Sequence, residues 1–356
     1  MSRPLFEPVQ MGRIQLSNRL VMAPMTRSRA VGNLANDMIA KYYADRATAG
    51  LIITEGISPS PNGLGYARIP GLFNQEQVAS WKKVTDAVHA KGGHIFVQLM
   101  HTGRASHPDN LPKGAKILAP SPIALSGKIW TDTAQQQPYP TPNEMTLDEI
   151  KSTIQEYITS AELAIQAGFD GVELHGANGY LIEQFLNPNA NKRSDMYGGS
   201  PENRMRFVLE IAKGTVEKIG GDRLGIRVSP YGVFNDTGAF EGINEFYSTL
   251  SQKLSDLGLV YIHVVDHSAM GAPPVNPEIK QLIRQNFKGL YITSGGYDEA
   301  RAQQDLKDKK GDLVAIGRPY ISNPDLLQKL KEGKPLTPPD PNTFYTPGDK
   351  GYNDYK

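Results

Sequence analysis

The feature of this sequence that most constrains its fold is an alternation that repeats eight times. Short runs of apolar and β-branched residues recur along the chain, and a longer segment with helical spacing of apolar residues follows each run. Near-continuous apolar runs indicate strands buried on both faces, as in a parallel sheet covered by helices. The predicted strands are residues 20–25, 51–57, 94–100, 171–175, 224–228, 261–265, 290–293 and 313–316.

The segments between these strands carry start signals for helices. The predicted helices are residues 36–48, 75–91, 147–167, 201–219, 242–257, 276–286, 298–308 and 323–332. Thr146 with Glu149 forms a capping-box pattern, and Ser200 and Asn323 each precede a proline at a first helical position. Eight strands each followed by a helix predict one α/β domain over residues 1–356, a (β/α)8 TIM barrel. A doubly wound open sheet is the alternative fold.

Two segments interrupt the alternation. Residues 101–146, after the third predicted strand, form a long insertion that carries seven prolines. Unstructured loops of this length are uncommon and usually functional, so we expect a lid or a small excursion at the barrel mouth. Residues 335–356 form a proline-rich tail, and its aromatic side chains predict that it folds back over the barrel mouth.

The composition excludes several classes of protein. Lys and Arg number 38 against 37 Asp and Glu, and this balance argues against a nucleic acid or a membrane surface as partner. The chain has no cysteine, which excludes disulfides, thiolate nucleophiles, iron–sulfur clusters and cysteine-ligated zinc. No stretch approaches the roughly 20 apolar residues that span a bilayer, and no signal-peptide pattern is visible. We therefore expect a soluble, cytoplasmic protein.

Polar residues and glycines stand where the predicted strands end, and in a TIM barrel these ends form the active site. Arg227 lies within a strand, and a buried guanidinium must be paired or hydrogen-bonded, which favours a ligand over an internal carboxylate as its partner. The other residues at the strand ends are Met25, Thr26, Glu55, Gly56, Gln98, His175, Asp266, His267, Ser294, Gly295, Gly296, Gly317 and Arg318.

Glycines follow the last two predicted strands. Gly295 and Gly296 come after the seventh strand, and Gly317 with Arg318 comes after the eighth. Barrels often bind phosphate at this point through backbone N–H groups, and an arginine adds a charge-assisted contact. The alternative is that these glycines only form tight turns. The sequence has no P-loop and no G-x-G-x-x-G motif to compete for the role.

His175, Asn178 and Tyr180 form a candidate catalytic group. The spacing of His175 and Asn178 at a strand end lets both donate hydrogen bonds to one carbonyl or nitro oxygen, as in an oxyanion hole. The phenol of Tyr180 is a weak acid suited to protonating a carbon centre. A structural role is the alternative for a single histidine here. A metal site is disfavoured, because the His263–His267 pair lacks a carboxylate pattern and no H-E-x-x-H motif occurs.

Four stretches of the chain resemble the Old Yellow Enzyme family of FMN-dependent NADPH ene-reductases. The stretches are Asn18–Arg27, Gln98–Arg104, His175–Leu186 and Asn191–Arg204, and the similarity runs from Leu5 to about Tyr355. The resemblance implies tightly bound FMN, NADPH or NADH as the reductant, and a small-molecule activated alkene as the substrate, such as an enone, enal, maleimide or nitroalkene. It leaves both a monomer and a homodimer open.

The resemblance also implies residue roles. Hydride passes from flavin N5 to the β-carbon of the alkene, His175 and Asn178 bind the electron-withdrawing group, and Tyr180 protonates the α-carbon. Arg227 places positive charge beside N1 and O2 of the flavin. The other residues implied to bind FMN are Pro24, Met25, Thr26, Gly56 and Gln98 at the ring, and Ser294, Gly295, Gly296, Gly317 and Arg318 at the phosphate.

Tyr66, Met100 and Tyr352 are implied to line the substrate pocket. Many members of the family carry tryptophan at the position of Met100, so methionine predicts a pocket that accepts bulkier alkenes. Another branch carries cysteine at the position of Thr26, and the threonine places this chain in a different branch.

Other functions remain open at the level of the sequence. The same flavin site suits the reduction of nitro compounds, nitrate esters or quinones. A flavin-free, phosphate-binding barrel lyase or isomerase needs only the glycine turns. A catalytically silent flavin- or ligand-binding protein is the third alternative, which the presence of Tyr180 beside the donor pair disfavours. The visible colour of the protein separates the flavin-free enzyme from the ene-reductase.

Overall fold

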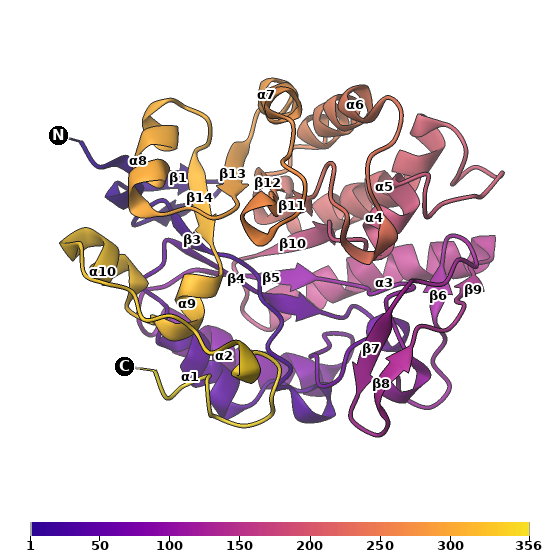
Figure 1. Ribbon diagram of the computed structural model, residues 1–356, viewed down its shortest axis with the longest axis horizontal. Helices are drawn as coiled ribbons and strands as arrows, with labels where there is room; N and C mark the ends of the chain where they lie inside the picture. Colours follow the sequence, from indigo (N-terminus) through magenta and orange to yellow (C-terminus); the bar gives the residue numbers. More distant parts are fainter. Residues whose placement is uncertain (1, 356) are drawn as a thin grey trace.

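A closed barrel of eight parallel strands forms the centre of the protein, shown in Figure 1 as a computed structural model that describes residues 2–355. The barrel strands are β3 (Leu20–Met22), β4 (Leu51–Ile57), β5 (Ile95–Leu99), β10 (Gly171–Gly176), β11 (Leu224–Val228), β12 (Tyr261–Val264), β13 (Leu290–Ser294) and β14 (Leu313–Ile316). They pair in the order β10–β11–β12–β13–β14–β3–β4–β5, and β5 closes the ring on β10. The predicted TIM barrel is therefore confirmed, and the open sheet is excluded.

Helices alternate with the barrel strands along the chain. The eight at predicted positions are α1 (Asp37–Ala44), α2 (Gln75–His89), α3 (Leu147–Gln166), α5 (Pro201–Ile219), α6 (Ile243–Asp256), α7 (Pro277–Asn286), α8 (Glu299–Lys307) and α10 (Leu326–Glu332). The capping box of Thr146 and Glu149 is present, and the Ser200 side chain caps α5. The predicted helix start at Asn323 is wrong. Its side chain instead bonds the backbone of Thr337 in the tail, and α10 begins three residues later.

Two short helices were not predicted, α4 (Leu181–Leu186) and α9 (Arg318–Ser322). Every residue of α4 is buried, so its sequence shows no alternation of apolar and polar faces. The five residues of α9 are too few for a helical period to be recognised. Both helices follow a barrel strand closely, after β10 and β14, and both therefore lie beside the strand ends.

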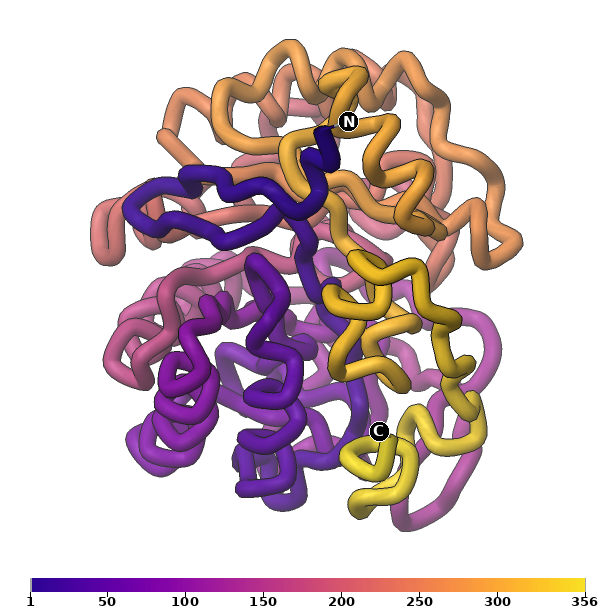
Figure 2. The backbone as a smooth tube through the Cα atoms, turned by 90° about the vertical axis from the view of Figure 1, so that its left-hand side faces the viewer, coloured from indigo at the N-terminus to yellow at the C-terminus, as the bar shows by residue number. Residues whose placement is uncertain are grey.

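A hairpin before the barrel, also absent from the prediction, closes the amino end of the barrel. Its strands are β1 (Val9–Met11) and β2 (Ile14–Leu16), and Figure 2 shows it in indigo on the side facing the viewer. Met11 and Leu16 are fully buried and belong to the same core cluster as Phe96 and Tyr261 of the barrel strands. Because apolar side chains fill this end, a ligand can approach only the carboxyl ends of the strands.

The insertion at residues 101–146 contains four short strands, β6 (Leu118–Ala119), β7 (Lys128–Thr131), β8 (Gln135–Pro138) and β9 (Asn143–Glu144). β7 and β8 form an antiparallel hairpin, and β6 pairs in parallel with β9. The predicted insertion after the third barrel strand is therefore confirmed, and the β7–β8 hairpin is its longest paired segment (Figure 1).

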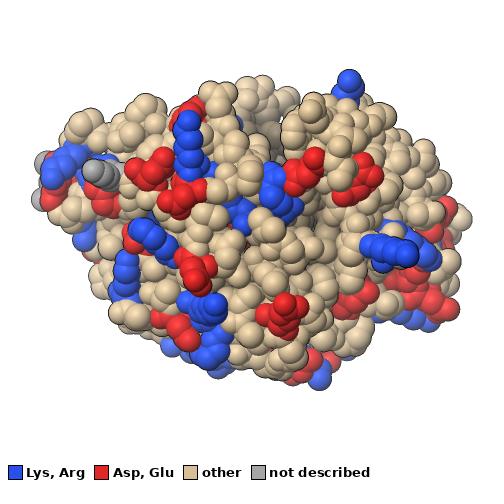
Figure 3. Space-filling model, turned by 90° about the horizontal axis from the view of Figure 1, so that it is seen from below, with Lys and Arg blue, Asp and Glu red and all other residues tan. Residues whose placement is uncertain are grey.

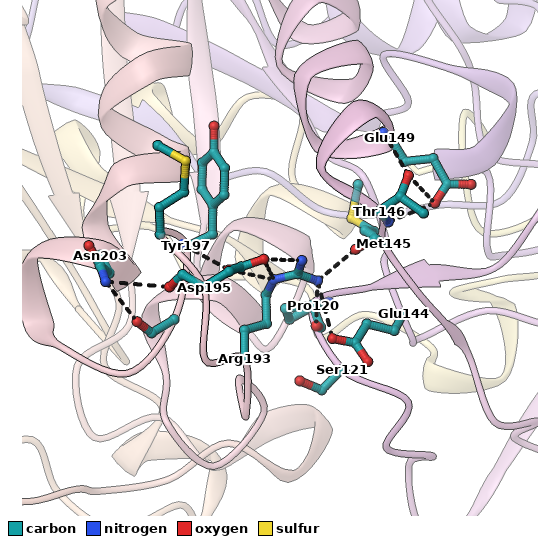
Figure 4. A network of polar contacts seen from close by, with 12 residues as sticks. Pro120, Ser121, Glu144, Met145, Thr146, Glu149, Arg193, Asp195, Tyr197 and Asn203 are labelled. Atoms are coloured by element: carbon teal, nitrogen blue, oxygen red, sulfur yellow. Dashed lines mark hydrogen bonds and ion pairs between the residues drawn. The ribbon is translucent and has the colours of Figure 1, made fainter.

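Arg193 fixes the base of the insertion to the loop before α5 (Figure 4). Its guanidinium donates to the carbonyl oxygens of Pro120 and Met145 at 3.1 and 2.7 Å and pairs with Asp195 at 2.5 Å. Arg193 is only 8% exposed, so these partners satisfy a charge that burial alone would destabilise. Arg193 is thus the residue of the stretch 191–204 that holds the base of the insertion in place.

The tail, yellow in Figures 1 and 2, runs along one side of the molecule past α1, and residues between 341 and 347 form part of the wall of the barrel mouth. Its last residue, 356, lies outside the described residues. Arg27 and Arg29, just after β3, donate hydrogen bonds of 2.7–3.1 Å to tail carbonyl oxygens, those of Thr343, Phe344, Gly348, Lys350 and Gly351. The side chain of Asn353 also donates to the carbonyl oxygen of Met38 in α1, at 3.0 Å. The predicted return of the tail to the barrel mouth is confirmed.

The surface carries both signs of charge. On the face in Figure 3, lysine and arginine side chains lie among aspartates and glutamates. Within residues 2–355, no helix has the length and apolar character needed to cross a membrane.

Candidate active site

A cavity of about 1140 Å³ lies at the carboxyl ends of the barrel strands. Its walls come from the strand ends and the loops after them, from the β7–β8 hairpin and from the tail. Sixteen of the predicted site residues line it: Pro24, Met25, Thr26, Gly56, Tyr66, Gln98, Met100, His175, Asn178, Tyr180, Arg227, Ser294, Gly295, Gly296, Gly317 and Arg318. Asp266 and His267, predicted at the end of β12, line it as well, so the closed barrel brings together residues from all eight strand ends.

Glu55, predicted at the end of β4, does not line the cavity: its carboxylate is buried and accepts a hydrogen bond from the hydroxyl of Tyr43 at 3.4 Å. Tyr352 also lies elsewhere. It is fully buried and does not line the cavity. Its ring stacks on that of Tyr42, with centroids 4.0 Å apart, and the guanidinium of Arg29 lies 4.5 Å from its centroid. These contacts draw the ring into the joint between tail and barrel, so the expectation that Tyr352 lines the substrate pocket is corrected. Tyr345 is the tail tyrosine that lines the cavity.

Arg227 supplies a buried positive charge to the cavity. It lies on β11, paired in register with His175 of β10 and His263 of β12. Burial lowers the pKa of Arg227, and the carboxylate of Glu173 partly offsets this. Its Nε is buried without a hydrogen-bond partner within residues 2–355. A buried guanidinium with an unused N–H suits an electron-rich or anionic ligand atom.

Glu173 orients the amide of Gln98. Gln98 Nε2 donates to Glu173 Oε1 at 2.7 Å, while the hydroxyl of Tyr261 and Nδ1 of His263 lie 3.1 and 3.0 Å from Oε2. One N–H and the carbonyl oxygen of the Gln98 amide are thereby left for a ligand. The sequence analysis missed this role of Glu173. The signal was its place two residues before His175, which puts both side chains on the same face of β10.

His175 is a neutral hydrogen-bond donor. Burial, and then the positive charge of Arg227, lower the pKa of His175 well below its usual value. The backbone N–H of Ala177 donates to His175 Nδ1 at 3.3 Å, which assigns the ring proton to Nε2. The imidazole therefore has one N–H available for a ligand at neutral pH.

Asn178 is held by its backbone in the left-handed region, at φ +60°. Asparagine tolerates this region better than most residues. Its N–H donates to Ser229 Oγ at 2.8 Å, and its carbonyl oxygen accepts from Asn235 Nδ2 at 2.7 Å. Ser229 Oγ in turn donates to Glu183 at 2.9 Å. The sequence analysis did not find these supporting residues, because they come from helix α4 and from the loop after β11, which only the fold brings together.

Tyr180 lies edge-on to two other rings of the cavity wall. Its ring centroid is 4.8 Å from that of His175 and 6.0 Å from that of Tyr66. Burial raises the pKa of Tyr180 to about 12. The phenol therefore keeps its proton at neutral pH, beside a neutral N–H donor.

The glycines after β13 adopt backbone conformations that favour glycine, with φ +124° at Gly295 and +63° at Gly296. A Cβ at Gly295 would lie 2.5 Å from the carbonyl oxygen of Asp266, so a side chain there would collide with the backbone. Arg318, after β14, lines the same part of the cavity. These features form an open, positively charged cradle of the kind that suits a phosphate.

The groups on the cavity wall fit FMN. A buried cation with an unused N–H and an oriented amide suit the polar edge of a flavin ring, and the glycine cradle suits its phosphate. Within residues 2–355, no group of three or more His, Asp or Glu side chains is arranged to hold a metal ion.

Comparisons of the sequence and of the structure with known proteins match nearly the whole chain to one family. The NADH:flavin oxidoreductase / NADH oxidase family matches residues 4–337. A probable flavin mononucleotide-dependent alkene reductase of Leishmania infantum is 40% identical, over 99% of this chain and 96% of that protein. The solved structure of morphinone reductase has a TM-score of 0.95 at 40% identity and covers 100% of this chain and 96% of that one. Morphinone reductase has also been solved in complex with tetrahydroNAD.

A second solved structure extends the comparison. The Old Yellow Enzyme homologue from Zymomonas mobilis has a TM-score of 0.94 at 36% identity, and each chain is 99% covered. Because the matches take in nearly all of the sequence and of each relative, the protein belongs to the Old Yellow Enzyme family of FMN-dependent oxidoreductases.

Proposed function

We propose that the protein is an ene-reductase that uses NADPH or NADH to reduce the C=C bond of activated alkenes. The observation that carries the proposal is that His175, Asn178 and Tyr180 line the same cavity as Arg227 and the glycine cradle. The alkene reductase of Leishmania infantum supports it as a relative over nearly the whole chain. The tetrahydroNAD complex of morphinone reductase supports a nicotinamide as the reductant.

When bound, FMN accepts a hydride from the nicotinamide and supplies one to the β-carbon of the alkene. The protein's own residues would hold this cofactor from three sides. Arg227 and Gln98 would bind the polar edge of the ring, and Pro24, Met25, Thr26 and Gly56 would contact the rest of it. Ser294, Gly295, Gly296, Gly317 and Arg318 would hold the phosphate.

His175 and Asn178 bind and polarise the substrate. The Nε2–H of His175 and an amide N–H of Asn178 donate to the carbonyl or nitro oxygen of the alkene. These donors stabilise the negative charge that grows on this oxygen as the β-carbon accepts a hydride, which is how an oxyanion hole accelerates a reaction. Because His175 is neutral, it donates its hydrogen bond and keeps its proton.

Tyr180 delivers the proton. Its phenol gives a proton to the α-carbon as negative charge develops there, so that the alkene gains one hydride and one proton. The raised pKa of Tyr180 keeps this proton in place until the substrate is reduced. Tyr66 and Met100 line the pocket beside it and limit the size of the alkene.

A product assay tests the proposal. Purified holoenzyme is incubated with NADPH and 2-cyclohexenone, and cyclohexanone is measured by gas chromatography against NADPH consumed. We expect one cyclohexanone per NADPH, and a large loss of this activity in the His175→Ala, Asn178→Ala double variant. Consumption of NADPH with nitro compounds or quinones but not with enones would reject the ene-reductase assignment.

A further inference from the structure

The side chain of Asn178, after β10, has a partner that follows β12, two strands further around the barrel. His267, in the segment that follows β12, places its Nε2 2.8 Å from Oδ1 of Asn178. Both residues line the cavity. Within residues 2–355, Nδ2 of Asn178 forms no hydrogen bond, so the contact with His267 is what orients this amide.

The imidazole of His267 is the donor in this bond. Burial, and then the positive charge of Arg227, lower the pKa of His267 to about 4, so the ring is neutral at neutral pH and carries one proton. Oδ1 of an amide has no proton to give, so the proton of the bond lies on Nε2. The opposite amide orientation needs an unprotonated Nε2 and turns an acceptor toward the oxygen of the substrate.

Neighbouring contacts hold His267 in place. The ring of Phe234 lies against the imidazole, with centroids 4.5 Å apart. The preceding residue, Asp266, pairs with Lys280 at 2.5 Å and accepts a hydrogen bond from the backbone N–H of Ser268. The imidazole is therefore positioned by packing on one side and by an anchored backbone on the other.

We propose that His267 is a positioning residue, which fixes the Asn178 amide with its N–H groups toward the substrate oxygen. This inference rests on the proposed function, in which Asn178 binds that oxygen. An amide without such a partner rotates about its last side-chain bond and presents Oδ1 to the substrate part of the time. His267 removes that unproductive orientation without touching the substrate oxygen itself.

The test measures how strongly the FMN-loaded enzyme binds 4-hydroxybenzaldehyde, whose phenol oxygen takes the place of the substrate oxygen. Binding is followed by the change in the visible absorbance of the flavin. His267→Phe removes the donor and keeps a flat ring against Phe234, while His267→Gln restores an N–H donor. The loss of one oriented hydrogen bond predicts a Kd about 5- to 10-fold higher for His267→Phe and within about twofold of the parent for His267→Gln.

A double-variant cycle with Asn178→Ala separates orientation from general damage. We expect Asn178→Ala to weaken binding at least as much as His267→Phe, and His267→Phe to cause no further loss once Asn178 is alanine. Equal losses in both backgrounds would overturn the proposal, because His267 would then act without Asn178. Parent-like binding by His267→Phe, or failure of His267→Gln to restore binding, would overturn it as well.

Two further outcomes are distinguishable. If Asn178→Ala itself leaves binding unchanged, the anchor pair of the proposed function fails, and the orienting role fails with it. If Asn178→Ala weakens binding and His267→Phe does not, the proposed function stands and only the role of His267 is lost. His267→Leu provides a second donor-free variant, should the phenylalanine variant retain FMN poorly.

Discussion

A Cβ atom on Gly56 would lie only 2.5 Å from the Sδ of Met100. Gly56 lies in β4, and Met100 follows the end of the neighbouring strand β5. Met100 is 1% exposed and packs with Tyr66 and Tyr180. The missing side chain at position 56 thus makes room for the side chain at position 100, and the size of residue 100 sets the shape of the pocket wall beside Tyr180.

Met100→Trp is expected to narrow the range of substrates. The larger indole has no free space toward Gly56, so it extends into the pocket. Because steric exclusion at one pocket position typically changes selectivity by about tenfold or more, we expect the kcat/KM ratio of a trimethyl-substituted cyclohexenone over 2-cyclohexenone to fall about tenfold. Met100→Leu, of similar volume, is the control. An unchanged ranking of bulky and small enones in the tryptophan variant would reject this role of Met100.

Tyr180→Phe is expected to separate the two half-reactions. Loss of a general acid typically costs about 10²- to 10⁴-fold in rate, so alkene reduction is expected to slow by that amount. Flavin reduction by NADPH needs no proton from Tyr180 and is expected to stay within about threefold of the parent. Stopped-flow absorbance measures both rates in the same preparation. Equal loss of both half-reactions would indicate that Tyr180 has only a structural role.

Glu183 is expected to make folding stability depend on pH. Burial raises the pKa of Glu183 to about 7. Between these two pKa values the folded protein keeps a proton on Glu183 that the unfolded chain releases. The contribution of Glu183 to the free energy of unfolding is therefore complete below its pKa in the unfolded chain, and it is lost as the pH rises through 7. The shift corresponds to about 3 kcal/mol at most. We expect Tm to fall less between pH 5.5 and 8 in Glu183→Gln than in the parent.

The pH profile of Glu183→Gln is not expected to become flat. Burial also raises the pKa of Glu55 to about 7, and this group contributes a change in the same direction. Glu76→Gln, on the exposed side of α2, is the matched control and should keep the parent profile. Parallel Tm profiles for the parent and Glu183→Gln would contradict the prediction.

Tyr352→Ala is expected to release the tail. The substitution removes a buried ring that stacks on Tyr42 and contacts Arg29, at a cost of about 3–5 kcal/mol typical of large aromatic truncations. Chemical denaturation measures this loss, and limited proteolysis should cut the tail faster. Tyr352→Phe is the control, because the hydroxyl has no hydrogen-bond partner within residues 2–355 and its removal should cost little. Similar protease resistance of the alanine and phenylalanine variants would contradict a role for the ring in holding the tail.

The barrel could be predicted from the sequence because strand and helix segments alternate eight times along the chain. The bounds of β4, β11 and β14 agree with the predicted strands, since each is a short segment rich in Leu, Ile and Val that begins and ends on an aliphatic residue. Helix α4 was missed because a fully buried helix of six residues has no polar face to mark its period. The start of α10 was misplaced because the side chain of Asn323 is recruited by the tail, a contact that no local pattern reveals.

The sequence predicted the site residues whose position follows from the end of a barrel strand. The rule that barrel sites form at carboxyl ends gathers residues as distant as Thr26 and Arg318. Tyr352 was misplaced because the direction of its ring depends on stacking with Tyr42, more than 300 residues earlier. The orientation of the Asn178 amide likewise depends on His267, 89 residues later, and only the folded chain brings the two together.

An anaerobic titration tests the central claim most directly. The visible spectrum of the purified protein is recorded, NADPH is added until the spectrum stops changing, and 2-cyclohexenone is then added. The account predicts a flavin spectrum that bleaches with NADPH and returns with the enone. A flavin that bleaches and does not recover with the enone, or a protein that binds no FMN, would contradict it.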